Sequence, residues 1–432
     1  MRKLRFLLGL LAAGALSAPA VWAEDAVLAP TPTNFVDDLW QNEKVSMVLK
    51  SDYFENSKSF NGEQNLWGGT AEMKAFPLIS SSIDGKFDVR VMNPNIPNGD
   101  VTNFDLLEGY LTFHLGNVDL RLGKQIVAWG RTDGINPTDN LTPHDLTVQL
   151  PFDDDMRFGT TALKLDYYLD SEMDLTLFTT PFFQPTKFPL PPTGYTYNQI
   201  IPAQTLNNSE VGVRLNKTGG DYDWSVSYFR GYRLLPDVSL EGNNPASSQL
   251  NINYSQVDVV GADFAHNIEQ YGVRAEVAYV HPTGPDPNDA NQINPYLQAV
   301  LGVDRTFDQE FNVNVQIIGR FIQNYNAAGP SDPNLQQVYQ LNAILNTQQD
   351  PSSYEMSFRV SDKWMNEILG AEVFGVVDLT HSDGYFRPSV NYAINDRLKG
   401  YVGWDIYYGA SNTPFGLLQP TQGFFAEMRY TF

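Results

Sequence analysis

The sequence predicts an all-β fold, a closed antiparallel transmembrane β-barrel of about eighteen strands. Three observations support this prediction: an export signal at the start of the chain, strand-length segments with alternating apolar and polar residues, and a last segment that ends in phenylalanine. Successive side chains of a β-strand point to opposite faces, so such alternation gives a sheet one apolar and one polar face. In a closed barrel the apolar face contacts lipid and the polar face encloses water.

The start of the chain has the pattern of a cleavable secretory signal peptide, which we assign to residues 1–23. Arg2, Lys3 and Arg5 form its basic start, and 6–16 is its apolar stretch. In Val21-Trp22-Ala23, Val21 and Ala23 are small residues at the two positions that a signal peptidase inspects. The apolar stretch is too short for a membrane anchor. We therefore expect a periplasmic N-terminal segment over 24–42 and a transmembrane β-barrel over 43–432.

The composition excludes several classes of protein. The formal net charge of −22 becomes −25 once the three basic residues of the signal peptide are removed, so binding to nucleic acid is not expected. The chain has no cysteine, which excludes thiolate metal sites and cysteine nucleophiles. Its 26 Phe, 22 Tyr and 7 Trp, with only 18% charged residues, suit strands that lie between lipid and water.

Reading the alternation along the chain gives eighteen segments. In one example, Leu107, Leu111 and Phe113 are predicted to share the apolar face opposite Glu108 and its polar neighbours. The predicted strands are 43–55, 66–78, 85–93, 103–115, 117–127, 157–169, 171–182, 208–217, 221–231, 251–265, 269–281, 295–305, 309–322, 352–361, 368–380, 385–394, 397–408 and 422–432.

The lengths of the connections support this count. With both termini in the periplasm, short turns are expected on the periplasmic side and long loops on the extracellular side. Sixteen strands result if 295–305 and one later segment are loops, but the connection 323–351 would then be periplasmic, so we prefer eighteen. The long connections predicted are 128–156, 183–207, 232–250, 282–294, 323–351 and 409–421.

The C-terminal segment alternates most clearly, with Phe424, Ala426, Met428, Tyr430 and Phe432 on one face. A soluble edge strand would show the same alternation. However, a terminal Phe with a Tyr two residues earlier resembles the signal by which the barrel-assembly machinery recognises outer-membrane barrels. We therefore expect that machinery as a partner through Phe432, together with outer-membrane lipid and lipopolysaccharide.

Charged residues on the strands are predicted to line the lumen, because charges facing lipid are costly. They form either a conduit for a polar solute or cross-strand ion-pair ladders, and the near balance of signs favours ladders for most of them. The basic set is Arg90, Arg121, Arg214, Arg274, Arg320, Arg359, Arg387, Lys399 and Arg429; the acidic set is Asp88, Glu108, Asp119, Glu210, Glu276, Glu355, Asp405 and Glu427. The pore-lining residues that we single out are Glu108, Asp119, Arg121, Gln125, Arg214, Arg274, Arg320 and Arg387.

The connection 128–156 is the candidate gate. It is too long for a simple connector, and long loops in compact folds are usually functional or disordered. It either folds into the mouth of the barrel and narrows it, or lies exposed against lipopolysaccharide. The gate residues proposed on it are Trp129, Asp133, Asn136, Asp139 and Asp145.

A resemblance to a known family rests on two regions. The run GKQ-x-x-x-WG-x-x-D-x-x-x-P-x-D, which begins at Gly123, resembles the signature of an outer-membrane family catalogued as domain of unknown function 1302. The closing stretch from Tyr385-Phe386-Arg387-Pro388 to Phe432 resembles the last strands of that family. The chain is more remotely similar to alginate-export barrels, from whose expected Arg-rich lumen its mixed charges depart. The resemblance implies a porin-like transport barrel without an established substrate.

Three adjacent carboxylates, Asp153, Asp154 and Asp155, are a candidate Ca²⁺ site if carbonyl groups and water complete the coordination. The alternative is a solvated run, or one that bridges lipopolysaccharide through divalent cations. No other cofactor is expected.

The chain is not expected to be an enzyme. It has no G-x-S-x-G, H-E-x-x-H or phosphate-loop motif, and His381 beside Ser382 lies on a predicted tight hairpin, where adjacent side chains diverge. Three functions stay open for a barrel in a Gram-negative outer membrane. They are a porin-like channel for a small polar or amphipathic solute, a dedicated exporter or importer of hydrophobic or polymeric cargo, and a surface-exposed structural or adhesin barrel.

Overall fold

The computed structural model describes residues 45–432 except 191–194, 245–246, 285–291 and 309. The predicted signal peptide, 1–23, and the predicted periplasmic segment, 24–42, lie outside the described residues.

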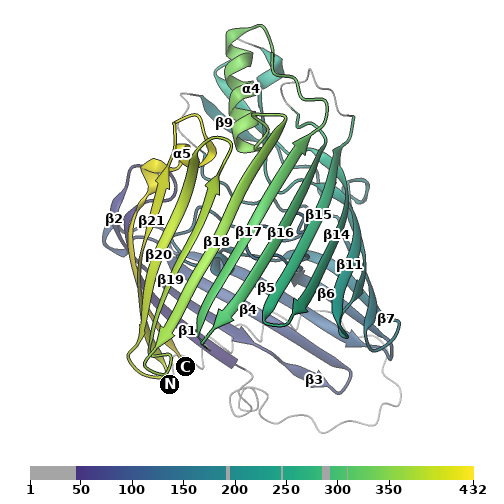
Figure 1. Ribbon diagram of the computed structural model, residues 1–432, viewed down its shortest axis with the longest axis vertical. Coiled ribbons are helices and arrows are strands. Elements are labelled where there is room, and N and C mark those ends of the chain that lie inside the picture. Colours follow the sequence, from purple (N-terminus) through teal and green to yellow (C-terminus); the bar gives the residue numbers. More distant parts are fainter. Residues whose placement is uncertain (1–44, 191–194, 245–246, 285–291, 309) are drawn as a thin grey trace, which may run out of the picture. The chain divides into compact units, whose positions relative to one another are not determined.

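Within the described residues, eighteen antiparallel strands form the barrel wall, each paired with its neighbours along the chain. The wall closes where the first strand pairs with the last, for example Lys50 opposite Arg429 (Figure 1). Closure leaves no unpaired sheet edge, as a wall in hydrocarbon requires. The strands are β1 (Val45–Asn56), β2 (Gln64–Ala75), β4 (Ile83–Asn93), β5 (Asn103–His114), β6 (Val118–Gln125), β7 (Thr160–Tyr168), β8 (Met173–Thr180), β10 (Glu210–Lys217), β11 (Tyr222–Tyr232), β14 (Gln256–Ile268), β15 (Tyr271–Pro282), β16 (Tyr296–Phe307), β17 (Phe311–Ile322), β18 (Ser352–Trp364), β19 (Leu369–Asp378), β20 (Asp383–Ala393), β21 (Leu398–Tyr408) and β22 (Gly423–Thr431).

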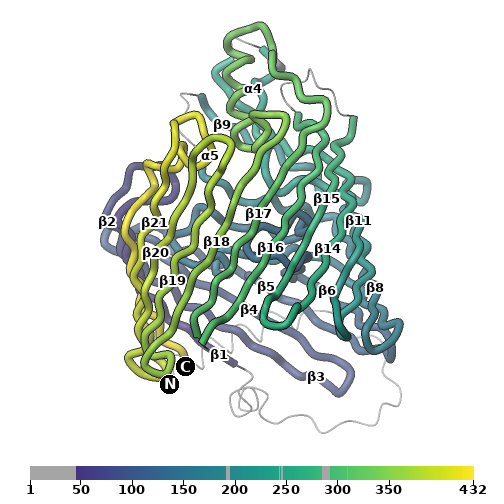
Figure 2. Tube along the Cα trace, in the orientation of Figure 1, coloured from purple at the N-terminus to yellow at the C-terminus, as the bar shows by residue number. Residues whose placement is uncertain are grey.

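The predicted fold class and strand count are confirmed. Every predicted segment overlaps one wall strand, and the weakest segment, 295–305, corresponds to β16, so the sixteen-strand alternative is excluded. Figure 2 shows the short turns at the end of the barrel where β22 ends, and the long connections at the opposite end. We call these two ends the turn end and the loop end.

Apolar side chains face outward and polar side chains face inward. On β17, Val315 and Ile317 are 37% and 46% exposed, whereas Asn314 and Gln316 between them are 7% and 1% exposed. A soluble protein shows the opposite pattern, with apolar residues inside. None of the described helices is both long and apolar enough to span a bilayer.

The loop end carries a small folded unit in connections that were predicted to be loops. Three short strands form a second sheet in the order β12-β13-β9, and the helix α4 packs against it. The shared core includes Val238, Leu250 and Ile252 of the sheet and Val338 of the helix. The elements outside the wall are β3 (Leu78–Ser80), β9 (Thr196–Gln199), β12 (Asp237–Leu240), β13 (Gln249–Asn253), α3 (Asp153–Met156), α4 (Pro333–Leu345), α5 (Pro414–Leu417), η1 (Ile96–Asn98), η2 (Leu206–Asn208), η3 (Glu241–Asn243) and η4 (Gln419–Thr421).

One predicted face is wrong. The register between β4 and β5 shifts after Asp88, so that Asp88 pairs with Glu108 and Val89 pairs with Leu106. Leu107 is the extra residue of this β-bulge, and it is only 6% exposed rather than outward with Leu111. A bulge reverses the alternation locally, which strict alternation cannot detect.

Gly123 on β6 is required by a close approach of backbone. Its φ is +129°, and a Cβ there would lie 2.3 Å from the carbonyl oxygen of Gly109 on β5. We predict that Gly123→Ala lowers the free energy of unfolding by about 1–3 kcal/mol or more. The backbone of β5 is held by its hydrogen bonds to β6 and cannot move away from the added Cβ.

The measurement is urea unfolding of the refolded barrel, with Gly116→Ala as the control. Gly116 also has a positive φ, +69°, but a Cβ there meets nothing within 4 Å. The Gly123 variant should therefore unfold at clearly lower urea, and equal losses in the two variants would contradict the steric explanation.

Candidate functional site

The connection between β6 and β7, residues 126–159, crosses the barrel interior; we call it the crossing segment. Arg131 forms an ion pair with Asp263 on β14, and Asp133 lies 3.0 Å from Arg359 on β18. Further along, Asp155 lies 2.8 Å from Lys50 on β1 and 2.8 Å from Arg429 on β22. The segment therefore contacts strands far from β6 and β7, where it begins and ends. Of the two courses that the sequence left open for 128–156, the structure shows the inward one.

The carboxylate of Glu276, on β15, is the main anchor of the crossing segment. It is 2% exposed, and its Oε2 accepts hydrogen bonds from the backbone N of Arg131 (3.1 Å) and of Thr132 (3.3 Å). Its Oε1 accepts from the backbone N of Thr138 (2.8 Å), and the hydroxyl groups of Thr132 and Thr138 lie 2.8 and 2.7 Å from the carboxylate. A buried carboxylate needs several donors of this kind. Gly130 allows the approach, because a Cβ there would lie 2.7 Å from Glu276 Oε1.

Glu276 was predicted to face the lumen, but its role as an anchor was not predicted. Its partners Thr132 and Thr138 are separated from it by more than a hundred residues and carry no motif of their own. The available signal was Gly130, which marks a position where backbone approaches another group closely.

The proposed gate residues are spread along the crossing segment. Trp129 is 3% exposed and packs against Gly212 of β10, and Asp133 pairs with Arg359 as described above. Asp139 lies 3.8 Å from Arg157, and Asp145 lies 2.7 Å from Lys187 in the β8–β10 connection. Asn136 and Asp139 line a cavity, which is described next.

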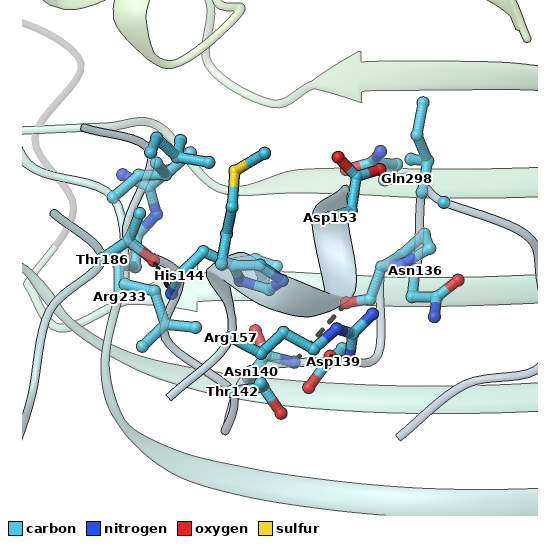
Figure 3. Close-up of a pocket in the computed structure, with 18 of the residues that line it drawn as sticks. Asn136, Asp139, Asn140, Thr142, His144, Asp153, Arg157, Thr186, Arg233 and Gln298 are labelled. Atoms are coloured by element: carbon cyan, nitrogen blue, oxygen red, sulfur yellow. Dashed lines mark hydrogen bonds and ion pairs between the residues drawn. The ribbon is translucent and has the colours of Figure 1, made fainter. Parts of the chain in front are cut away.

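Cavities lie on both sides of the crossing segment. The larger, about 510 Å³, is at the loop end, between residues 134–157 and the upper parts of β15, β16 and β19 (Figure 3). Two others, about 390 and 330 Å³, are at the turn end, where Trp129 and Asp133 of the segment contribute to their walls. The segment therefore separates a loop-end compartment from turn-end compartments within the lumen.

Most of the predicted pore-lining charges have a partner. Glu108 pairs with Lys86, and Arg214 lies 3.4 Å from Asp263, Arg274 2.9 Å from Asp304 and Arg387 2.6 Å from Asp405. These contacts favour the prediction that most lumen charges form ion pairs between strands over a conduit lined by free charges.

The remaining pore-lining residues have other contacts. Asp119 contacts His114 (2.7 Å), and the guanidinium of Arg121 lies 4.4 Å from the centre of the Tyr110 ring. Arg320 donates to the carbonyl oxygen of Asn346, and Gln125 donates to the carbonyl oxygen of Ala162. Asp119, Arg121 and Arg214 line one turn-end cavity together, whereas the other predicted residues are dispersed.

The three adjacent carboxylates do not form a common site. Asp155 is engaged by Lys50 and Arg429, the side chain of Asp154 is 96% exposed, and that of Asp153 is 62% exposed, 4.0 Å from Arg387. Across the described part of the chain, no three His, Asp or Glu side chains are grouped so that they could hold a metal ion. Each of the three carboxylates faces an arginine: Asp153 faces Arg387, Asp154 lies 3.6 Å from Arg157 Nε, and Asp155 faces Arg429. The Ca²⁺ site stays a prediction.

His381, in the hairpin between β19 and β20, joins two outer connections. Its Nδ1 lies 2.7 Å from Asp378 and its Nε2 lies 2.8 Å from Asp350, which follows α4. Partial burial lowers the pKa of His381, but hydrogen bonds and charge from Asp378 and Asp350 outweigh it and raise the pKa above the usual 6.5.

This contact predicts a pH dependence. A raised pKa gives stability that is present in full below pH 6.5 and is lost as the pH rises through the folded-state pKa. We expect amide protection factors in residues 346–350 to fall as the pH rises above that value, and to be independent of pH in His381→Asn. Equal pH profiles for the two proteins would refute the link.

The fold and the interior define a class of protein. A closed eighteen-stranded antiparallel barrel with an apolar exterior and a polar interior is the fold of outer-membrane porins. Three solved structures share it: Acinetobacter baumannii OccAB2 (TM-score 0.53, 11% identity), A. baumannii OccAB4 (0.51, 11%) and Pseudomonas aeruginosa OccK5, also called OpdH (0.50, 10%). Each match covers 90% of this chain and 97% of the other. At such identity the likeness concerns the fold alone.

The sequence comparison places the chain in a family. It belongs to the family described as protein of unknown function (DUF1302), whose model matches residues 55–325. The remoter likeness to alginate-export barrels is not shown by these comparisons. A comparison with curated proteins gives no match.

Proposed function

We propose that this protein is an outer-membrane channel that passes a small polar or amphipathic solute through a charged lumen narrowed by the crossing segment. The observation that carries the proposal is the position of that segment, between cavities on its two sides and attached to β1, β14, β15, β18 and β22. A constriction made of protein groups at the centre of a barrel determines which solutes pass.

The apolar outer face of the wall supports a location in the outer membrane. An outward face with rows of exposed Val, Ile, Leu and aromatic residues needs lipid around it, and lipopolysaccharide is the neighbour expected at the loop end. We further propose that the C-terminal strand presents Phe432, 55% exposed, to the assembly machinery.

The proposal includes no catalytic step. The histidine beside a serine, His381, directs both ring nitrogens at carboxylates, Asp378 and Asp350, and not at the Ser382 hydroxyl. A nucleophile–base pair needs the histidine within hydrogen-bonding distance of the nucleophile.

The test is single-channel recording of residues 24–432 refolded and inserted into planar bilayers. The channel function predicts stepwise ion conductance with small steps, because the crossing segment occupies the lumen. An absence of any conductance from protein that is shown to be folded would favour an occluded transporter or a structural barrel.

A further inference from the structure

The walls of the loop-end cavity combine an apolar part with polar residues such as Asn136, Thr142 and Gln298. The apolar part comes from three elements. The crossing segment contributes Ile135, Leu146 and Met156, the start of the β11–β14 connection contributes Leu234, and the barrel wall contributes Val280 and Phe374. Its volume, about 510 Å³, lies within the range typical of small-molecule sites. Apolar surface facing a cavity of this size favours a solute with an apolar body.

Two buried polar atoms at this cavity make no hydrogen bond. The Asp139 side chain is 9% exposed and its Oδ1 has no hydrogen-bond partner. The Nε of Arg157 is also buried without a hydrogen bond, and Asp154 Oδ1 lies 3.6 Å from it, beyond hydrogen-bonding distance. The two side chains face each other in Figure 3, but the 3.8 Å between Arg157 and Asp139 Oδ2 is too long for a hydrogen bond. Burial raises the pKa of Asp139 to about 7, although the charge of Arg157, the backbone N–H groups of Leu141 and Trp129 and the Thr142 hydroxyl lower it.

Other charged groups at the cavity are engaged or open to solvent. Arg233 lies 3.3 Å from Asp237 and donates to Asn346 at 2.7 Å, while Asp153 is mostly exposed. Burial, the largest effect, and the charge of Arg157 lower the pKa of His144, so its ring is neutral at pH 7. Above the pKa of Asp139, about 7, the pair therefore carries one acceptor and one donor of opposite charge and gives no net attraction for an ion. A hydroxyl or primary amide can satisfy both atoms, because it donates and accepts at once.

We propose that the loop-end cavity binds a solute with an apolar body and an uncharged hydroxyl or primary amide head, which donates to Asp139 Oδ1 and accepts from Arg157 Nε. This rests on the proposed channel function and specifies its substrate class. A buried polar atom without a hydrogen bond costs free energy. The cavity should therefore bind a head group that pairs with both atoms more tightly than one that pairs with a single atom.

The test measures equilibrium binding by saturation-transfer NMR to the barrel in lipid nanodiscs, with empty nanodiscs subtracted. The probes are 3-phenylpropanol, 3-phenylpropanamide, 3-phenylpropanoate and propylbenzene. We expect saturable binding of the alcohol and the amide, each about tenfold tighter than the carboxylate and propylbenzene, as expected for a hydrogen bond to a charged group.

Asp139→Ala and Arg157→Gln should each weaken binding of the alcohol about tenfold. The control, Asp304→Asn, removes a lumen carboxylate that pairs with Arg274 and lines a turn-end cavity, so it should leave binding unchanged. If a variant fails to fold, the relative affinities of the four probes for the unaltered protein still test the proposal. Equal or tighter binding of the carboxylate, or no saturable binding, would overturn the proposal. Because binding is measured without flux, this result is independent of whether the barrel conducts.

Discussion

Replacing residues 131–155 with a short glycine–serine linker is expected to raise the single-channel conductance several-fold and to weaken ion selectivity. The ends of the crossing segment are neighbours, since Gln125 at the end of β6 pairs with Thr160 at the start of β7. A short linker can therefore join the strands without disturbing the backbone pairs of the wall. Removal of the segment joins the loop-end and turn-end cavities into one continuous lumen.

The matched control replaces α4, Pro333–Leu345, with a similar linker. This helix lies at the loop end beyond the wall strands, where it packs on the small three-stranded sheet (Figure 1). Its loss should leave the conductance close to that of the unaltered protein. A conductance unchanged by removal of 131–155, in a barrel that keeps its heat-modifiable mobility on gels, would rule out the crossing segment as the constriction.

The second large effect is expected from Glu276→Ala. Without this carboxylate, the backbone N–H groups of Arg131, Thr132 and Thr138 lose their acceptor inside the barrel, at about 1–3 kcal/mol for each group. The free energy that holds the crossing segment to the wall should fall by at least about 3 kcal/mol. The fraction of molecules in which the segment is detached should therefore rise roughly a hundredfold. Amide exchange over 130–138 should accelerate by that factor, and the open-channel current should become noisier.

Two further variants separate this effect from a general loss of charge. Glu276→Gln keeps one acceptor oxygen and should give an intermediate rate of exchange. Asp304→Asn removes a lumen carboxylate of the neighbouring strand that pairs with Arg274 of the wall (2.9 Å), so exchange over 130–138 should not change. Equal exchange in Glu276→Ala and the unaltered protein would show that other contacts hold the segment.

The wall was predictable because closure imposes one rule on every strand. The alternation of apolar and polar residues located all eighteen strands, because the outer face of each strand contacts lipid and the inner face contacts water. The bulge at Leu107 was not predictable, because one inserted residue leaves both flanking patterns intact. The helix α4 left a signal that was not used: Asp332 before Pro333 is a typical helix start, and its side chain caps the backbone N–H groups of Asn334 and Leu335.

The site was predictable only in part. The length of the connection 128–156 and its glycines indicated a segment with a special course, and the structure places it inside the barrel. Which residues hold it there depends on contacts between distant parts of the chain, such as Thr138 with Glu276 and Asp133 with Arg359. The unsatisfied atoms of Asp139 and Arg157 likewise emerge only from the packing around them.

The lipid-facing and water-facing sides of the wall can be measured directly, because the chain has no cysteine and single cysteines can be introduced. Asn314 lines a turn-end cavity, and the next residue on β17, Val315, is 37% exposed on the outer face. In liposomes, Asn314→Cys should react with a charged thiosulfonate from water, and Val315→Cys only with a lipid-soluble maleimide. Reaction of Val315→Cys with the charged reagent while Asn314→Cys stays protected would contradict a barrel with lipid outside and water inside.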